Sequence, residues 1–132
     1  MPLGKAVKPL LERHLERSAG RFKGVRYSTG WDASEGIPNV TPAEHMLLDP
    51  AVLAAAGVLA EMQLSLDVWL YHPQLPDVAK LAAALPGLTI VLNHVGSPIL
   101  GGPYRGKQDE VFADWRRLIG EVAAHDNVYC KL

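Results

Sequence analysis

The sequence predicts an α/β fold in which parallel strands alternate with helices. Short apolar stretches of strand length recur along the chain, and longer amphipathic or alanine-rich stretches separate them. Gly, Pro, Asn and Asp mark most of the boundaries between these stretches. Apolar strands separated by helices form parallel βαβ units, so we expect one sheet covered by helices.

The first part of the chain predicts a helix, a strand and a long loop. Residues 5–18 place apolar side chains on one helical face and charged side chains on the other. Residues 22–28 alternate in polarity as a half-buried strand does. The loop at residues 29–40 is rich in Gly, Pro, Asn and Asp, and its length indicates either a lid over a site or a mobile surface segment.

Two start signals for helices follow this loop. Thr41-Pro42-Ala43-Glu44 has the pattern of a capping box and predicts a short helix that ends near Leu48. Asp49-Pro50 combines an N-cap residue with proline at the first helical position, and it predicts an alanine-rich helix to about residue 63.

The rest of the chain continues the alternation of strands and helices. Residues 64–71 and 88–92 have the composition of strands, and residues 127–131 begin another one. Residues 76–85 and 109–124 are expected to be helices, the second of them amphipathic. The chain therefore contains four recognisable strands.

Composition supports a single soluble globular domain. The 132 residues are 48% hydrophobic and 20% charged, and 13 Lys and Arg against 14 Asp and Glu give a formal net charge of −1. The lack of a basic excess argues against binding to nucleic acid through bulk charge, and the lack of an 18-residue apolar run argues against a membrane span. No signal-peptide core follows the N-terminus, and the single cysteine cannot form an internal disulfide, so we expect a cytoplasmic protein.

Functional residues in parallel α/β folds lie at the carboxyl ends of the strands. That rule selects a short set of residues, namely Arg26, Tyr27, Ser28, Tyr71, His72, Asn93, His94 and Lys131.

The two strand-end histidines are the first candidates for chemistry. His72 and His94 each follow a strand directly, so both are expected at the same rim of the sheet. A neutral imidazole can ligate a metal, and an imidazole near its pKa can act as a general acid or base. His14, His45 and His125 lie on or beside helices and are expected to be structural.

Arg26 has two readings, and other residues are further candidates. Arg26 can clamp a substrate carboxylate or can form an internal ion pair, for which Asp67 is the expected partner. Tyr71 and Asn93 at strand ends and Trp31 in the 29–40 loop are candidates for substrate binding. Cys130 is expected to be a core cysteine within a strand.

Four segments give the chain a family resemblance. Phe22–Arg26, Trp69–Pro73, Val91–Pro98 and Asn127–Leu132 resemble the amidohydrolase-related family in order and spacing. That family comprises metal-dependent TIM-barrel hydrolases and includes fuconolactonase-like lactonases, dicarboxylate lactonases and related decarboxylases. Its most specific match here is the His-x-Gly-x-Pro motif that begins at His94.

The resemblance implies a (β/α)₈ barrel that hydrolyses a small carboxylated lactone or a related carbonyl compound, often with a divalent metal such as zinc. By position, His72 resembles a metal-ligating histidine, and His94 resembles a strand-end histidine that binds metal or transfers protons. Arg26 resembles an arginine near the substrate, and Lys131 matches a strand-end lysine to which we assign no role.

Two family features are missing from this sequence. The family has a His-x-His pair after its first strand and an aspartate after its last strand, and neither occurs here. Barrels of this type take about 250 residues, so we expect a single partial barrel over residues 1–132, with about four βα units and no turnover by itself. The substrate is expected to be a small molecule, and a homo-oligomer is possible. The alternatives are a non-catalytic half barrel that dimerises as an assembly module, or a decarboxylase.

Overall fold

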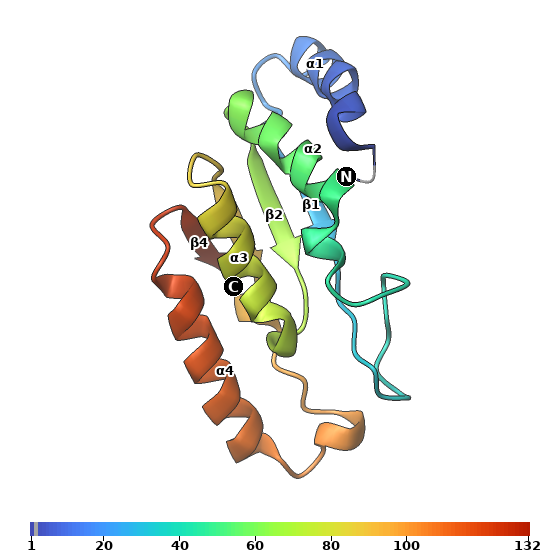
Figure 1. Cartoon of the computed structure of the whole chain (residues 1–132), viewed down its shortest axis with the longest axis vertical. Coiled ribbons are helices and arrows are strands. Elements are labelled where there is room, and N and C mark those ends of the chain that lie inside the picture. The colour runs from blue at the N-terminus through green and yellow to red at the C-terminus, as the bar shows by residue number, and fades with distance from the viewer. Residues whose placement is uncertain (2) are drawn as a thin grey trace.

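The computed structural model describes Met1 and residues 3–132, and its centre is a parallel sheet of four strands (Figure 1). The strands are β1 (Gly24–Ser28), β2 (Ser65–Trp69), β3 (Ile90–Asn93) and β4 (Val128–Lys131), which pair in chain order. The helices are α1 (Lys8–Arg17), α2 (Pro50–Glu61), α3 (Leu75–Ala84) and α4 (Gln108–Ala123). Short 3₁₀ turns cover Gly4–Val7, Met46–Leu48, His72–Gln74, His94–Gly96 and Gly102–Tyr104. This architecture confirms the predicted alternation of parallel strands and helices.

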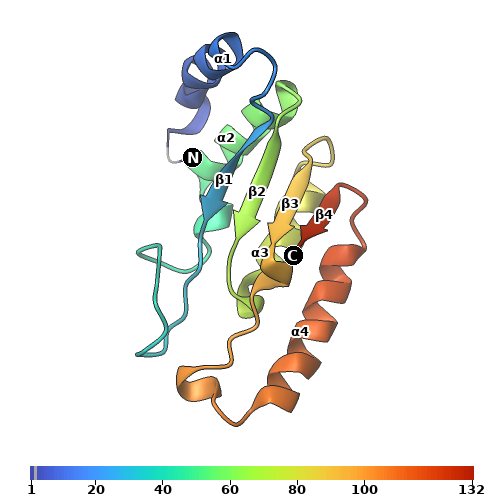
Figure 2. The same cartoon turned by 180° about the vertical axis from the view of Figure 1, so that it is seen from behind.

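The order of the strands determines where the helices lie. Each connection between successive strands leads to the adjacent strand, always in the same direction across the sheet. Such crossover connections between parallel strands are almost always right-handed. The helices between the strands therefore lie on the same side of the sheet. Figure 2 shows the opposite face of the sheet with no helix in front of it. A sequentially ordered sheet with helices on one side is the arrangement found in one part of a TIM barrel.

The hydrophobic core lies between the sheet and its helices. Leu66 and Val68 in β2 and Ile90 and Leu92 in β3 have no exposed surface, because alternate strand residues point toward the helices. The residues between them point to the face that the helices leave open. The open face is therefore free to carry polar side chains.

The start of α2 follows the predicted signal. The Asp49 carboxylate accepts hydrogen bonds from the backbone N–H of Ala51 at 2.8 Å and of Val52 at 3.4 Å. Asp49 is thus the N-cap, and Pro50 occupies the first helical position, where its missing N–H costs nothing.

The predicted short helix from Thr41 to Leu48 is wrong. The Thr41 hydroxyl donates to the carbonyl of Ala43 at 3.2 Å and does not cap a helix. His45 has a left-handed backbone with φ 59°, and only Met46–Leu48 form a 3₁₀ turn. His45 instead contacts both carboxylate oxygens of the buried Asp77 at 3.0 Å. A tertiary contact therefore overrides a local helix signal.

The prediction of a core cysteine is also wrong, because Cys130 is exposed. It lies in β4, which pairs on one side only, with β3. In the part of the chain that the structure describes, no helix is both long and apolar enough to cross a membrane.

Candidate functional site

Four polar side chains from four strands meet on the open face of the sheet. Arg26 and Asp67 are neighbours in the register of β1 and β2, and Asn93 and Lys131 are neighbours in β3 and β4. The Asp67 carboxylate lies 2.8 Å from Lys131 Nζ and 3.6 Å from the Arg26 guanidinium. Arg26 also donates to Asn93 Oδ1 at 3.1 Å. We call these four residues the strand cluster.

Asn93 orients the strand cluster from a buried position. Its side-chain amide donates to the carbonyl of Val68 at 3.0 Å, and the residue has no exposed surface. This bond orients the amide oxygen of Asn93 toward Arg26, so Asn93 and Asp67 hold the guanidinium from two sides. The side chains of Arg26 and Lys131 remain about half exposed, at 50% and 47%. Two cations against one carboxylate leave the cluster with a surplus positive charge, which suits an anionic ligand.

His94 stands directly after Asn93, at the start of a strained turn. His94, Val95, Gly96 and Ser97 all have positive φ angles, of 51°, 48°, 73° and 37°. A left-handed backbone is unusual for any residue with a side chain, and most of all for a β-branched one such as Val95. Such outliers persist only where surrounding contacts hold them, and they concentrate at functional sites.

Contacts from three places hold this turn. The Ser97 N–H donates to the carbonyl of His94 at 2.8 Å, and the His72 N–H donates to the carbonyl of Ser97 at 3.3 Å. The indole of Trp115 in α4 donates to the carbonyl of Val95 at 2.7 Å. The imidazole of His94 itself is exposed at the carboxyl end of β3, as the sequence predicts.

His72 is buried, with 2% of its surface exposed, and faces a different environment. Its Nδ1 accepts a hydrogen bond from the Ile99 N–H at 3.3 Å, so the neutral ring carries its proton on Nε2. Burial lowers the pKa of His72, and the carboxylates of Asp114 and Asp32 oppose that shift only in part. His72 therefore offers a neutral N–H donor.

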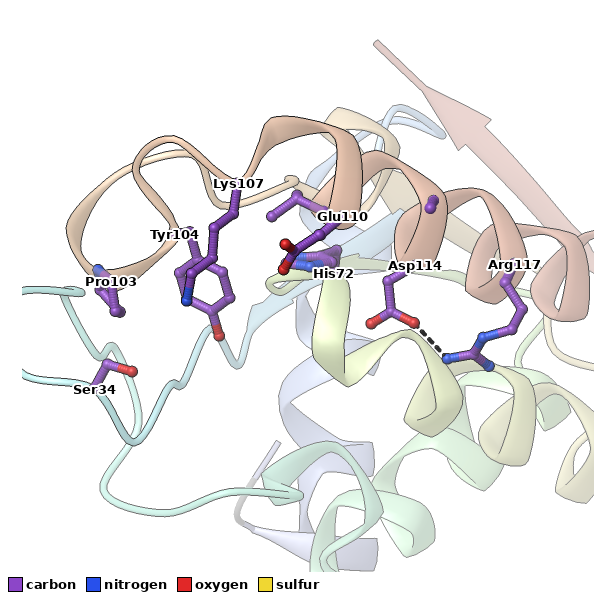
Figure 3. A pocket seen from close by; sticks show the side chains of 10 residues that line it. Ser34, His72, Pro103, Tyr104, Lys107, Glu110, Asp114 and Arg117 are labelled. Carbon is purple, nitrogen blue, oxygen red and sulfur yellow. Dashed lines mark hydrogen bonds and ion pairs between the residues drawn. The ribbon is translucent and has the colours of Figure 1, made fainter.

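His72 lines a pocket of about 750 Å³ between the start of α4 and the loops at residues 29–40 and 97–107 (Figure 3). Among the described residues, the pocket is also lined by Ser34, Pro103, Tyr104, Lys107, Glu110, Val111, Ala113, Asp114 and Arg117. His94 and Arg26 do not line it. The structure therefore does not bring the two strand-end histidines together in one pocket.

The 29–40 loop is fixed by Gln74, which the sequence did not single out. The buried amide of Gln74 donates to the carbonyl of Thr29 at 2.9 Å, and it accepts from the N–H of Trp31 at 2.9 Å and of Tyr71 at 3.3 Å. The Tyr71 hydroxyl donates to the carbonyl of Pro38 at 2.7 Å. Trp31 and Tyr71, both predicted to bind substrate, thus take part in the hydrogen bonding that holds the loop.

A second anchor joins this loop to the segment before α4. The Tyr104 hydroxyl donates to Asp32 Oδ2 at 2.6 Å. Burial and the neighbouring Asp32 raise the pKa of Tyr104 to about 12. Burial alone would raise the pKa of Asp32, but hydrogen bonds from Tyr104 and Ser34 bring it below its ordinary value. No short-range pattern links positions 32 and 104, so sequence reasoning missed this pair.

The remaining histidines, which are expected to be structural, make contacts away from the pocket. His14 is exposed and stacks on Phe22 with ring centroids 5.2 Å apart, and His45 pairs with Asp77. The N–H of His125 donates to the carbonyl of Val122 at 3.2 Å, after the end of α4. Within Met1 and residues 3–132, no group of three His, Cys, Asp or Glu side chains gathers closely enough to hold a metal ion.

Comparison with known families gives a match over nearly the whole chain. Residues 4–132 match a family model described as Amidohydrolase. The chain is 28% identical over 126 residues to the uncharacterized protein y4mH of Sinorhizobium fredii, which covers 96% of this chain and 39% of that protein. It is 39% identical over 66 residues to an L-fucono-1,5-lactonase of Burkholderia multivorans, which covers 50% of this chain and 22% of that enzyme.

Solved structures share the same fold. An amidohydrolase of Burkholderia multivorans with bound zinc has a TM-score of 0.71 and 28% identity, and the match covers 93% of this chain and 39% of that one. The chain therefore spans about two fifths or less of the length of these relatives. These matches do not favour the alternative of a non-catalytic assembly module.

Proposed function

Because this chain belongs to the amidohydrolase family, we propose that it supplies part of the active site of a hydrolase that opens a small carboxylated lactone. The lactonase relatives support the lactone as the reacting group. The observation that carries the proposal is the surplus positive charge of the strand cluster on the open face of the sheet.

In this proposal the strand cluster binds the carboxylate of the substrate. The Arg26 guanidinium is planar and can donate two parallel hydrogen bonds to a carboxylate. Asn93 and Asp67 hold it from the side, so little side-chain freedom is lost when substrate binds. Lys131 adds a second positive charge next to Asp67. Asp67 and Asn93 are positioning residues in this scheme.

His94 is the proposed group for proton transfer. Water adds to the lactone carbonyl carbon, and the imidazole of His94 takes a proton from that water. The bond between the carbonyl carbon and the ring oxygen then breaks, and the same proton passes to the ring oxygen. The product is the open hydroxy acid. Histidine is the side chain that most often serves as general acid and base near neutral pH.

A metal ion in this site would need more protein ligands than the described residues of this chain bring together. A bound zinc ion lowers the pKa of water to about 7 and so supplies hydroxide near neutral pH. Catalytic zinc sites take three protein ligands, whereas the described residues contain no such group, and the Nε2 of neutral His72 carries a proton. The proposed steps therefore use side chains alone.

The test is lactone opening by the complete gene product that contains these residues. We expect His94→Ala to abolish turnover with the fold unchanged by circular dichroism. Arg26→Met is expected to raise KM at least about tenfold for lactones that carry a carboxylate, equivalent to roughly 1.4 kcal/mol of binding. For lactones without a carboxylate, the rise in KM should be much smaller.

The matched control is Arg13→Met on the exposed face of α1, which should leave all kinetic constants unchanged. Retained activity in His94→Ala would refute the assigned role of His94. An equal loss by Arg26→Met for both kinds of lactone would refute carboxylate recognition by the strand cluster.

A further inference from the structure

We propose that the pocket at the start of α4 binds a small zwitterion, a molecule with one ammonium and one carboxylate group. The pocket measures about 750 Å³, within the range of about 300–1,000 Å³ found for small-molecule sites. The inference is independent of the proposed lactone hydrolysis, because it concerns His72, Lys107 and Glu110 and none of the residues in that scheme.

His72 provides a hydrogen-bond donor that borders this pocket. Its Nδ1 is already occupied by the Ile99 N–H, and its Nε2–H has no hydrogen-bond partner among Met1 and residues 3–132. The Nε2 atom is not itself fully buried, because it borders the pocket, so a ligand oxygen can replace water as its acceptor. A carboxylate oxygen is the strongest such acceptor.

The charged residues of the pocket divide into an ion-paired group and two groups without an ion pair. Arg117 pairs with Asp114 at 2.7 Å and with Glu121 at 2.8 Å, so two carboxylates already engage its charge. In the part of the chain that the structure describes, Lys107 and Glu110 have no ion-pair partner within 4.0 Å. Figure 3 shows both side chains directed toward the same hollow.

Opposite free charges at one hollow favour a zwitterion over a simple ion. The Glu110 carboxylate can accept hydrogen bonds from the ammonium group of the ligand. Lys107 and the His72 Nε2–H can donate to its carboxylate, against the negative charges of Asp114 and Asp32 near His72. A ligand with a single charge would satisfy one of the two groups and face a like charge at the other. The ring of Tyr104, which meets His72 edge-on at 5.8 Å, and Val111 supply apolar surface for the carbon chain between the two charges.

Isothermal titration calorimetry with 4-aminobutanoate tests the proposal. Butanoate and butylamine are matched probes that keep one charge each. Because these groups lie near the surface, we expect a Kd of about 1 mM for 4-aminobutanoate and at least tenfold weaker binding of either single-charge probe. Amide chemical shifts of Val111 and Ala113 should move with saturation, since both residues line the pocket.

Variants locate the binding. Glu110→Gln and Lys107→Gln should each weaken 4-aminobutanoate binding roughly tenfold. Glu16→Gln and Lys8→Gln on α1 make the same chemical changes elsewhere and should leave binding unchanged. The lack of saturable binding, equal binding of all three probes, or no effect of the pocket variants would overturn the proposal. Arg26→Met should keep zwitterion binding, so failure of lactone opening leaves this test intact.

Discussion

Replacing Gln74 by methionine tests whether one buried amide fixes the 29–40 loop. Methionine has a similar length but cannot form the three hydrogen bonds of Gln74 with Thr29, Trp31 and Tyr71. Each such bond contributes about 1 kcal/mol, and a backbone group left buried without a partner costs about 1–3 kcal/mol. Counting the two bonds of 2.9 Å fully and the bond of 3.3 Å in part, we expect a loss of about 3 kcal/mol in the free energy of unfolding.

Urea denaturation at pH 7, followed by circular dichroism, measures this loss. With a slope of about 2 kcal/mol per molar urea, the midpoint should fall by about 1.5 M. Gln108→Met, at the exposed start of α4, is the matched control and should shift the midpoint by less than about 0.3 M. A Gln74→Met protein as stable as this control would refute the argument that the amide holds the loop.

Three further predictions concern the same region. Gly96→Ala should cost about 2 kcal/mol or more in urea unfolding, because Gly96 has φ 73° and an added Cβ would lie 2.6 Å from Leu75 Cδ2. Tyr104→Phe should cost about 2 kcal/mol at pH 7. Because the folded-state pKa of Asp32 is lowered, the charge-assisted part of that cost should be lost in unfolding curves as the pH falls through this value. The folded-state pKa of His72 is also lowered, so the unfolded chain binds more protons below about pH 6.5. Stability should therefore fall from pH 7 to 5, and His72→Gln should flatten this profile.

The parts of the fold that depend on local pattern were predictable from the sequence. The alternation in residues 64–71 places Leu66 and Val68 in the core, and the structure has them fully buried. The Asp49-Pro50 signal starts α2 at the expected residue. The pairing of Arg26 with Asp67 was one of two readings, and the parallel register of β1 and β2 makes it a direct cross-strand neighbour.

The parts that depend on contacts between distant residues were not predictable. The capping-box pattern at Thr41 gives way to the contact of His45 with Asp77, 32 residues later in the chain. Gln74 and Tyr104 carry no local signal of function, and each acts on the 29–40 loop through contacts that only the folded chain creates. His72 followed its strand as expected, but the bond from Ile99 directs its ring to the pocket at α4.

The turn at His94 has a consequence for cooperative unfolding. Its left-handed residues are held partly by the indole of Trp115, so the backbone around Val95 cannot keep its conformation once α4 separates from the sheet. Detachment of α4 and relaxation of this turn should therefore occur as one opening event, with similar amide hydrogen-exchange protection in both segments. The indole N–H resonance of Trp115 in NMR spectra would then report whether His94 is held in its native position.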